Sequence, residues 1–371
     1  MNERHAYVAL NMMEKVGPVG VRALTEVLGS AELIFEADKT DLMKADGIGP
    51  DVANAIVSQR DHVDWEGELD KAEKSGARIV TRIDSEYPAS LKEIHDPPLA
   101  LYVRGSFESR DKNSIAVVGT RRPTLYGKET AARLSAQLVK CGFAVVSGMA
   151  EGIDTVAHEA ALKANGRTLA VMGSGLDCIY PASNKSLAGR ISDRGAVVTE
   201  FPFGRRPDKT TFPMRNRIVS GMTMGVLVVE AGSRSGAIIT VNQALDQGRT
   251  VFAVPGRIDS NASKGTNELI RQGARLVTGI DDVLAEFEFL LPEPGLKAAP
   301  ESAAIEIVLQ PKEEILAGCL AEGAKDVDSL IRLSDMGAAE VNATLIALEM
   351  KRVVRMMPGR MVELTNRTAI T

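Results

Sequence analysis

One pattern repeats through the middle of the chain: an apolar run, a turn, and then a helical or polar segment. The apolar runs are SIAVVG, FAVVSG, TLAVMGSG, AVVTEF, MGVLVVEA, TVFAVPG and RLVTG. Strands that are apolar almost throughout are covered by other elements on both faces, and strand–helix alternation makes neighbouring strands parallel. The pattern therefore predicts an α/β fold built on a doubly wound parallel sheet.

The flanking blocks have other patterns. Residues 1–74 contain short helical segments beside Gly-Pro turns, which predicts a small helical N-terminal domain of the helix-hairpin-helix or SAM-like type. An extended Rossmann-like domain is expected over 75–289, followed by a proline-rich linker over 290–310. Residues 311–371 show three helical stretches and two short strands around Pro358-Gly359, which predicts a winged-helix-like domain.

Both flanking blocks leave DNA contact open. Gly47-Ile48-Gly49-Pro50 resembles a hairpin that holds a DNA phosphate at a helix N-terminus, but an aspartate flanks it on each side. The third helix of the C-terminal block carries Glu340 and Glu349 against Lys351 and Arg352 at its end. We expect a structural or protein-docking role for both blocks, because these charges are poorly suited to phosphate.

The composition excludes several classes of protein. The net charge is −5, so the chain is not basic throughout, although a local cluster of cations can still bind nucleic acid. The three cysteines are far apart and the four histidines are scattered, so we expect neither a disulfide framework nor a metal site. No apolar stretch approaches about 18 residues, so we expect a cytoplasmic protein without membrane contact.

The turns after the predicted strands share one chemistry. Ligands of doubly wound sheets bind at the carboxyl ends of the strands, where glycine and hydroxyl residues expose N–H groups to anions. Between Gly204 and Arg217 the chain has five basic residues and one acid. Positive charge is therefore concentrated at this rim of an acidic protein.

A dinucleotide-binding enzyme is one interpretation of this sheet. That fold places Gly-x-Gly-x-x-Gly after its first strand and an acid about 20 residues further on for the ribose. Here Gly119 is followed by Arg121 and Thr124, and the second strand ends in Ser147-Gly148 with no such acid. The sequence therefore disfavours a dinucleotide, and we expect no cofactor.

Two other interpretations remain. A nucleotide- or nucleoside-processing enzyme could use Asp154, Asp177 or Glu200 as acid or base, although each has a structural alternative and no nucleophile–base pair is visible. A binder of a phosphate polymer better explains arginines at several separate turns, since one small phosphate needs only one or two. Phe212 or Tyr180 could stack a base, but packing is the favoured role of each.

Motifs in these turns resemble a known family. They are Gly-Thr-Arg-Arg-Pro, Ser-Gly-x-Ala-x-Gly-Ile-Asp, Gly-x-Gly-x-Asp-x-x-Tyr-Pro-x-x-Asn, Phe-Pro-x-Arg-Asn-Arg-Ile-Val-Ser-Gly, Glu-Ala-x-x-x-Ser-Gly-x-x-x-Thr and Lys-Gly-Thr-Asn-x-Leu-Ile-x-x-Gly-Ala, in that order. This set resembles the DNA-processing protein A family (DprA/Smf) over about Ser85 to Asp282. The resemblance implies a homodimer, formed through the Rossmann-like domain, that binds single-stranded DNA during natural transformation. It also implies that the protein protects this DNA, helps load the RecA recombinase and has no catalytic activity.

The resemblance and the strand-end pattern together give the predicted DNA contacts. No catalytic residue is expected. The predicted DNA-binding residues are Gly119, Thr120, Arg121, Arg122, Ser147, Gly148, Asn184, Lys185, Phe212, Arg215, Asn216, Arg217, Ser233 and Ser235.

Overall fold

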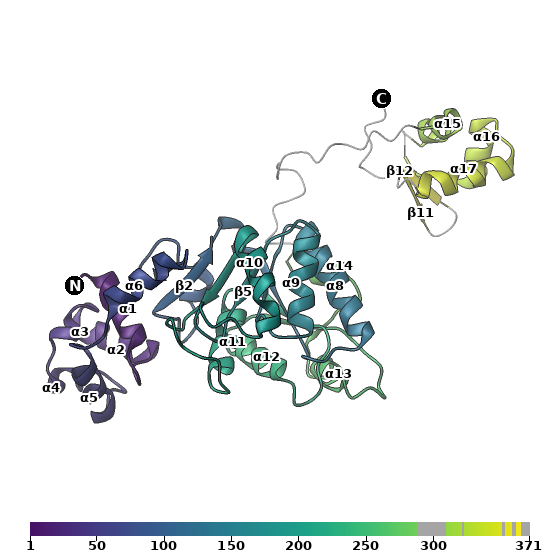
Figure 1. Ribbon diagram of the computed structural model, residues 1–371. Helices are drawn as coiled ribbons and strands as arrows, with labels where there is room; N and C mark the ends of the chain where they lie inside the picture. Colours follow the sequence, from purple (N-terminus) through teal and green to yellow (C-terminus); the bar gives the residue numbers. More distant parts are fainter. Residues whose placement is uncertain (288–308, 321–322, 351–352, 358–360, 365–371) are drawn as a thin grey trace. The chain divides into compact units, whose positions relative to one another are not determined.

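The computed structural model describes residues 1–287, 309–320, 323–350, 353–357 and 361–364 (Figure 1). The chain divides into two compact units, 1–291 and 292–371. None of the helices within the described ranges is long and apolar enough to cross a membrane.

The first unit is built on a nine-stranded sheet with the order β1-β2-β6-β5-β4-β3-β7-β8-β9. The strands are β1 (Arg78–Thr81), β2 (Ala100–Gly105), β3 (Ser114–Val118), β4 (Ala144–Ser147), β5 (Thr168–Val171), β6 (Ala196–Thr199), β7 (Gly225–Val228), β8 (Thr250–Ala253) and β9 (Arg275–Leu276). Strands β3 to β9 are parallel, which confirms the predicted doubly wound sheet. The strand order reverses between β3 and β7. An antiparallel hairpin, β1–β2, extends the sheet beside β6 and was not predicted.

Helices cover both faces of the sheet (Figure 1). They are α7 (Ala89–Lys92), α8 (Leu125–Lys140), α9 (Ile153–Lys163), α10 (Lys185–Arg194), α11 (Thr211–Gly221), α12 (Gly236–Asp246), α13 (Lys264–Arg271) and α14 (Ile280–Phe287), with the short 3-10 helices η1 (Ser109–Lys112) and η2 (Ala182–Asn184). Successive strand residues alternate between the two cores. Ala116 and Val118 of β3 pack with α11 and α12, whereas Ile115 and Val117 pack with α8 and α9. Burial on both faces explains why the strands β3 to β8 are apolar almost throughout.

The N-terminal helices are α1 (Glu3–Met12), α2 (Pro18–Leu28), α3 (Leu33–Glu36), α4 (Lys39–Leu42), α5 (Pro50–Gln59) and α6 (Trp65–Lys74). Their core includes Leu99, next to β2, and Val8 of α1 packs with Ile79 and Tyr102 of the hairpin. The helical block thus belongs to the same compact unit as the sheet. The boundary at residue 74 stays a prediction.

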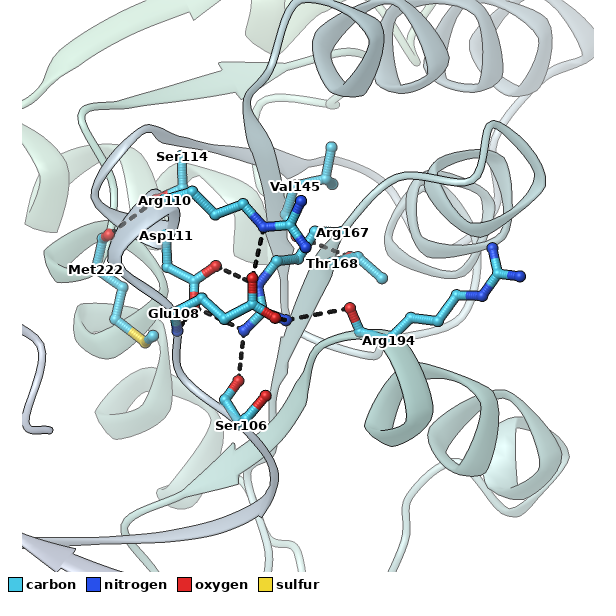
Figure 2. Close-up of polar contacts among 10 residues, drawn as sticks. All are labelled: Ser106, Glu108, Arg110, Asp111, Ser114, Val145, Arg167, Thr168, Arg194 and Met222. Atoms are coloured by element: carbon cyan, nitrogen blue, oxygen red, sulfur yellow. Dashed lines mark hydrogen bonds and ion pairs between the residues drawn. The ribbon is translucent and has the colours of Figure 1, made fainter. Parts of the chain in front are cut away.

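A buried arginine in the connection before β5 forms hydrogen bonds to the β2–β3 connection and to the end of α10, before β6 (Figure 2). Arg167, which is 5% exposed, donates to both carboxylate oxygens of Asp111 and, over 2.9 Å, to Glu108 Oε1. It also donates to the carbonyl oxygens of Ser106 and Arg194. These bonds join η1 to β5 and to the end of α10.

The second unit contains α15 (Pro311–Cys319), β10 (Lys325–Asp326), α16 (Val327–Ser334), α17 (Ala338–Met350), β11 (Val354–Met357) and β12 (Met361–Leu364). The three helices enclose one apolar core, and the strands pair in the order β10-β12-β11. This arrangement confirms the predicted winged-helix-like fold and adds a third strand to it. The predicted turn at Pro358-Gly359, Lys351 and Arg352, and most of the predicted linker lie outside the described residues.

Candidate nucleic-acid interface

A pocket of about 480 Å³ opens at the carboxyl ends of β3 and β4, next to the start of α12, which follows β7. The strand order reverses beside it, between β3 and β7. We call it the switch-point pocket. Its walls are the turns after β3 and β4, the segment from Lys209 into α11, and the first turns of α12. This is the place where doubly wound sheets hold ligands, because the connections after β3 and β7 lead to helices on opposite faces of the sheet.

The turn after β3 is fixed by a buried glutamate. Thr120 N donates to the carbonyl oxygen of Glu230 over 2.7 Å. The Glu230 carboxylate accepts from Thr124 N at 2.8 Å and from Thr124 Oγ1 at 2.7 Å, and Thr124 caps α8. Arg121 lies between these anchors with its side chain exposed and its Cζ atom 5.2 Å from the centre of the Phe212 ring. The anchored turn therefore places the exposed Arg121 guanidinium over the Phe212 ring at the pocket, within cation–π distance.

The turn after β4 is held by Asp154. Its Oδ2 accepts from Gly148 N at 3.0 Å and from Ala150 N at 3.3 Å. Burial raises the pKa of this carboxyl group, while the Arg215 charge and these hydrogen bonds oppose the rise. Gly152 has a φ of +84°, and a Cβ there would lie 2.4 Å from the carbonyl oxygen of Thr120. Only glycine allows the two turns to approach so closely.

Arg215 forms the charged floor of the pocket. Its side chain is 4% exposed, and its Nη1 donates to the carbonyl oxygens of Gly148 and Val171. Burial lowers its pKa to about 10, with Asp154 opposing the change, so the guanidinium stays charged at neutral pH. Within the described residues, Nη2 donates to no protein group. A buried cation with a free donor is suited to an anionic ligand.

Two further cations stand at the mouth of the pocket. Arg121 and Lys209 are exposed and line it, and neither belongs to an ion pair of the described chain. The only acid of the basic segment, Asp208, is engaged by Arg205, at 2.7 Å, and by the backbone of Thr211, at 3.0 Å. The pocket is thus electropositive although the chain carries net negative charge.

Two aromatic rings adjoin these cations. Phe212 lines the pocket, and its ring centre lies 5.8 Å from that of Tyr180, which is 48% exposed. A shallow second hollow is bounded by Arg121, Tyr180, Phe212 and Arg215. The two rings pack on each other and Arg121 lies over the Phe212 ring, while Tyr180 stays about half exposed. Both stacking on a base and simple packing are compatible with this geometry.

The carboxylates considered for catalysis all have structural partners. Asp154 holds the turn after β4, and Asp177 accepts from Gly204 N at 2.9 Å. Glu200 pairs with Arg217, and burial raises the pKa of Glu200. Within the described ranges, no group of three or more histidine, cysteine, aspartate or glutamate residues could hold a metal ion.

Family models match both units of the chain. The model described as DNA recombination-mediator protein A matches residues 78–288. The chain belongs to this family. A second model, the DprA winged helix domain, matches residues 298–360.

Individual members align over most of the chain. Protein Smf of Synechocystis sp. is 31% identical over 390 residues, which cover 96% of this chain and 98% of that protein. The X-ray structure of DNA processing protein A from Streptococcus pneumoniae has a TM-score of 0.68 at 36% identity, and the match covers 78% of this chain and 99% of that one. The structure of the Helicobacter pylori protein, described as having a unique single-stranded DNA binding mode, has a TM-score of 0.52 at 31% identity and covers 57% of this chain and 96% of that one.

The structure gathers about half of the predicted contacts in the switch-point pocket. These are Gly119, Thr120, Arg121, Gly148, Phe212, Arg215, Asn216 and Ser235. Arg122, Lys185 and Ser233 are exposed outside its lining. Whether any of these residues contacts DNA stays a prediction.

Three predicted contacts are buried in structural roles. Ser147 Oγ donates to the carbonyl oxygen of Val117 at 2.6 Å, inside the sheet. Asn184 Nδ2 donates to the Met149 carbonyl oxygen at 3.0 Å and to Thr155 Oγ1 at 2.8 Å. Arg217 pairs with Glu200 and with Asp96, away from the pocket lining. Lys209 was not among the predicted contacts, although it belongs to the basic segment that the sequence analysis identified.

Proposed function

We propose that this protein binds single-stranded DNA without sequence preference through the switch-point pocket, and acts in recombination during natural transformation. The arrangement of Arg215, Arg121 and Lys209 carries the proposal: a buried guanidinium with a free donor lies below two unpaired cations. Membership of the DNA recombination-mediator family and the DNA-binding mode described for the Helicobacter pylori relative support it.

The pocket would hold the backbone of the strand. A phosphate accepts from Arg215 Nη2 and from backbone N–H groups of the two turns, while Arg121 and Lys209 supply long-range attraction. The rings of Phe212 and Tyr180 offer π-faces to a neighbouring base, which every base can use. Phosphate contacts and stacking carry little sequence information, so binding is sequence-independent.

The resemblance extends this proposal to partners. We infer a cytoplasmic homodimer that protects incoming DNA and helps load the RecA recombinase. A binding protein is favoured over a nucleotide- or nucleoside-processing enzyme, because the candidate carboxylates are each engaged in structural hydrogen bonds.

Replacement of Arg121 by Ala tests the pocket. Arg133, which is exposed on α8 outside the pocket lining, provides a control with the same loss of charge. We expect Arg121→Ala to weaken the binding of single-stranded DNA of any sequence and to reduce the slope of log affinity against log salt by about one. Arg133→Ala should leave the affinity and the salt slope unchanged. Fluorescence anisotropy at several salt concentrations measures this, and native affinity in Arg121→Ala would contradict the proposal.

A further inference from the structure

A third hollow, of about 640 Å³, opens at the same edge of the sheet, between the first turn of α8 and the segment that follows β8. We call it the Tyr126 groove; it is lined by Thr124–Tyr126, Glu230, Pro255–Arg257, Ser260 and Ser263. Its walls expose apolar surface to solvent. Leu125 is 72% exposed and the adjacent Tyr126 is 49% exposed, so two neighbouring large apolar side chains face solvent at this hollow.

The groove is preformed. Tyr126 donates its hydroxyl hydrogen to the carbonyl oxygen of Pro255 at 2.9 Å, which fixes the tyrosine ring across the gap between the two segments. Both oxygens of the Glu230 carboxylate are engaged by Thr124, and Glu230 is 2% exposed. The carboxylate of Glu230 is therefore buried and engaged by hydrogen bonds from Thr124.

The groove and the switch-point pocket are lined by one continuous segment. Residues 119–121 of this segment line the pocket, and residues 124–126 line the groove. Arg121 and Leu125 are four residues apart, so their backbones are separated by at most about 14 Å. Arg122 lies between them with its side chain exposed. At the far side of the groove Arg257 is 83% exposed and pairs with Asp259 at 2.8 Å.

From this continuity, and resting on the function proposed above, we propose that the Tyr126 groove is a second subsite for the same DNA strand, in which the Tyr126 ring stacks a base. A strand that leaves the pocket along 119–126 passes Arg122, which attracts its phosphates, and then meets a fixed aromatic ring beside an apolar wall. Stacking on a preordered ring tolerates any base, as the pocket itself does. A nucleobase has a flat apolar face and polar edges, which suits a hollow of this kind.

Oligonucleotide length separates the two subsites. We expect Tyr126→Ala to lower the affinity for long homothymidine oligonucleotides about tenfold, the loss of one stacked base, without affecting the shortest oligonucleotides that fill the pocket. Tyr126→Phe keeps the ring but loses its hydrogen bond to Pro255, so it should retain most of the affinity that Tyr126→Ala loses. Leu125→Ser alters the exposed wall and should reproduce part of the loss. A long oligonucleotide with abasic sites in place of its bases should not distinguish Tyr126→Ala from the native protein.

The outcomes distinguish this inference from the proposed function. If Arg121→Ala weakens binding at every length and Tyr126→Ala at none, the groove is not a DNA subsite and the pocket assignment stands. If Tyr126→Ala weakens short and long oligonucleotides equally, or weakens the abasic strand, base stacking in the groove is excluded. If neither variant weakens any oligonucleotide, the proposed function itself fails.

Discussion

His158 is a buried, neutral histidine on α9, next to the floor of the switch-point pocket. Its Nδ1 lies 2.7 Å from Thr168 Oγ1, and this hydroxyl donates its own hydrogen to the Val145 carbonyl oxygen at 2.7 Å. His158 Nδ1 must therefore be the protonated nitrogen. Nε2 is left buried with no hydrogen-bond partner among the described residues. Burial, and then the Arg215 charge, lower the pKa of His158 to about 3.

This lowered pKa predicts a loss of stability in acid. The unfolded chain takes up a proton at His158 below its ordinary pKa of 6.5, whereas the folded protein does so only near 3. Stability contributed by His158 is thus complete above pH 6.5 and falls as the pH approaches 3. Between about pH 7 and pH 4 the free energy of unfolding of the native protein should fall by about 3 kcal/mol more than that of the His158→Gln variant. Urea unfolding at each pH measures this; parallel pH profiles for the two proteins would contradict it.

Burial also explains which site residues could not be predicted from the sequence. Arg215 and Arg217 are two positions apart in one basic segment and were both predicted to contact DNA. In the folded chain Arg215 lines the pocket, whereas Arg217 is neutralised by Glu200 and Asp96. The partners of Arg217 come from distant segments, so no local pattern separates the two arginines. The strand-end turns were predictable, because the sheet topology alone brings them together.

At the scale of single elements, Arg167 shows how connections at the amino edge of the sheet are fixed. Its guanidinium satisfies two carboxylates and two carbonyl groups with almost no exposure to solvent (Figure 2). Arg167→Met removes the buried charge that pairs with Asp111, which keeps only its hydrogen bond from Glu108 N, and takes the Arg167 donor away from both carbonyl groups. We expect a loss of about 3–5 kcal/mol in the free energy of unfolding.

Arg110 is the matched control for this prediction. It pairs with the same Glu108 at 2.6 Å, but its side chain is 63% exposed. Arg110→Met should therefore cost less than about 1 kcal/mol, since solvent screens a surface pair. Denaturant unfolding of the two variants measures the difference. Equal losses would show that burial does not determine the contribution of this network.

Some strands of the sheet could be predicted from the sequence and others could not. The parallel strands are short apolar runs bounded by turns, and each was identified from its own residues. The β1–β2 hairpin has no such signal, because Arg82–Leu99, including α7, lies between its strands in place of a tight turn. Its pairing depends on the N-terminal helices that pack against it. The β1–β2 pairing could therefore not be predicted from the residues of these two strands alone.

At the scale of the whole molecule, the two edges of the nine-stranded sheet differ. Helices α1 and α6 pack against β1. The other edge strand, β9, has both of its residues exposed, and Leu276 there is 46% exposed. Leu245, at the end of α12, is 59% exposed and lines the same shallow depression as Arg275 of β9. An exposed strand edge flanked by apolar side chains is a natural pairing surface, so we expect the proposed homodimer to form there.

Leu276→Glu tests this interface, and Leu333→Glu is its control, because Leu333 is 57% exposed on α16 of the second unit. In a two-fold symmetric dimer this edge of one copy faces the same edge of the other, so the two introduced glutamates would lie close together and repel each other. We expect sedimentation at micromolar concentration to give a dimer for the native protein and Leu333→Glu, and a monomer for Leu276→Glu.

Two linked pockets raise the affinity for a strand long enough to reach both, through effective concentration. The affinity of Leu276→Glu for long single-stranded DNA should therefore fall about a hundredfold or more, while its affinity for short oligonucleotides should equal that of the native protein. A dimeric Leu276→Glu protein would place the interface elsewhere, and a monomeric native protein would remove bivalent binding from the mechanism.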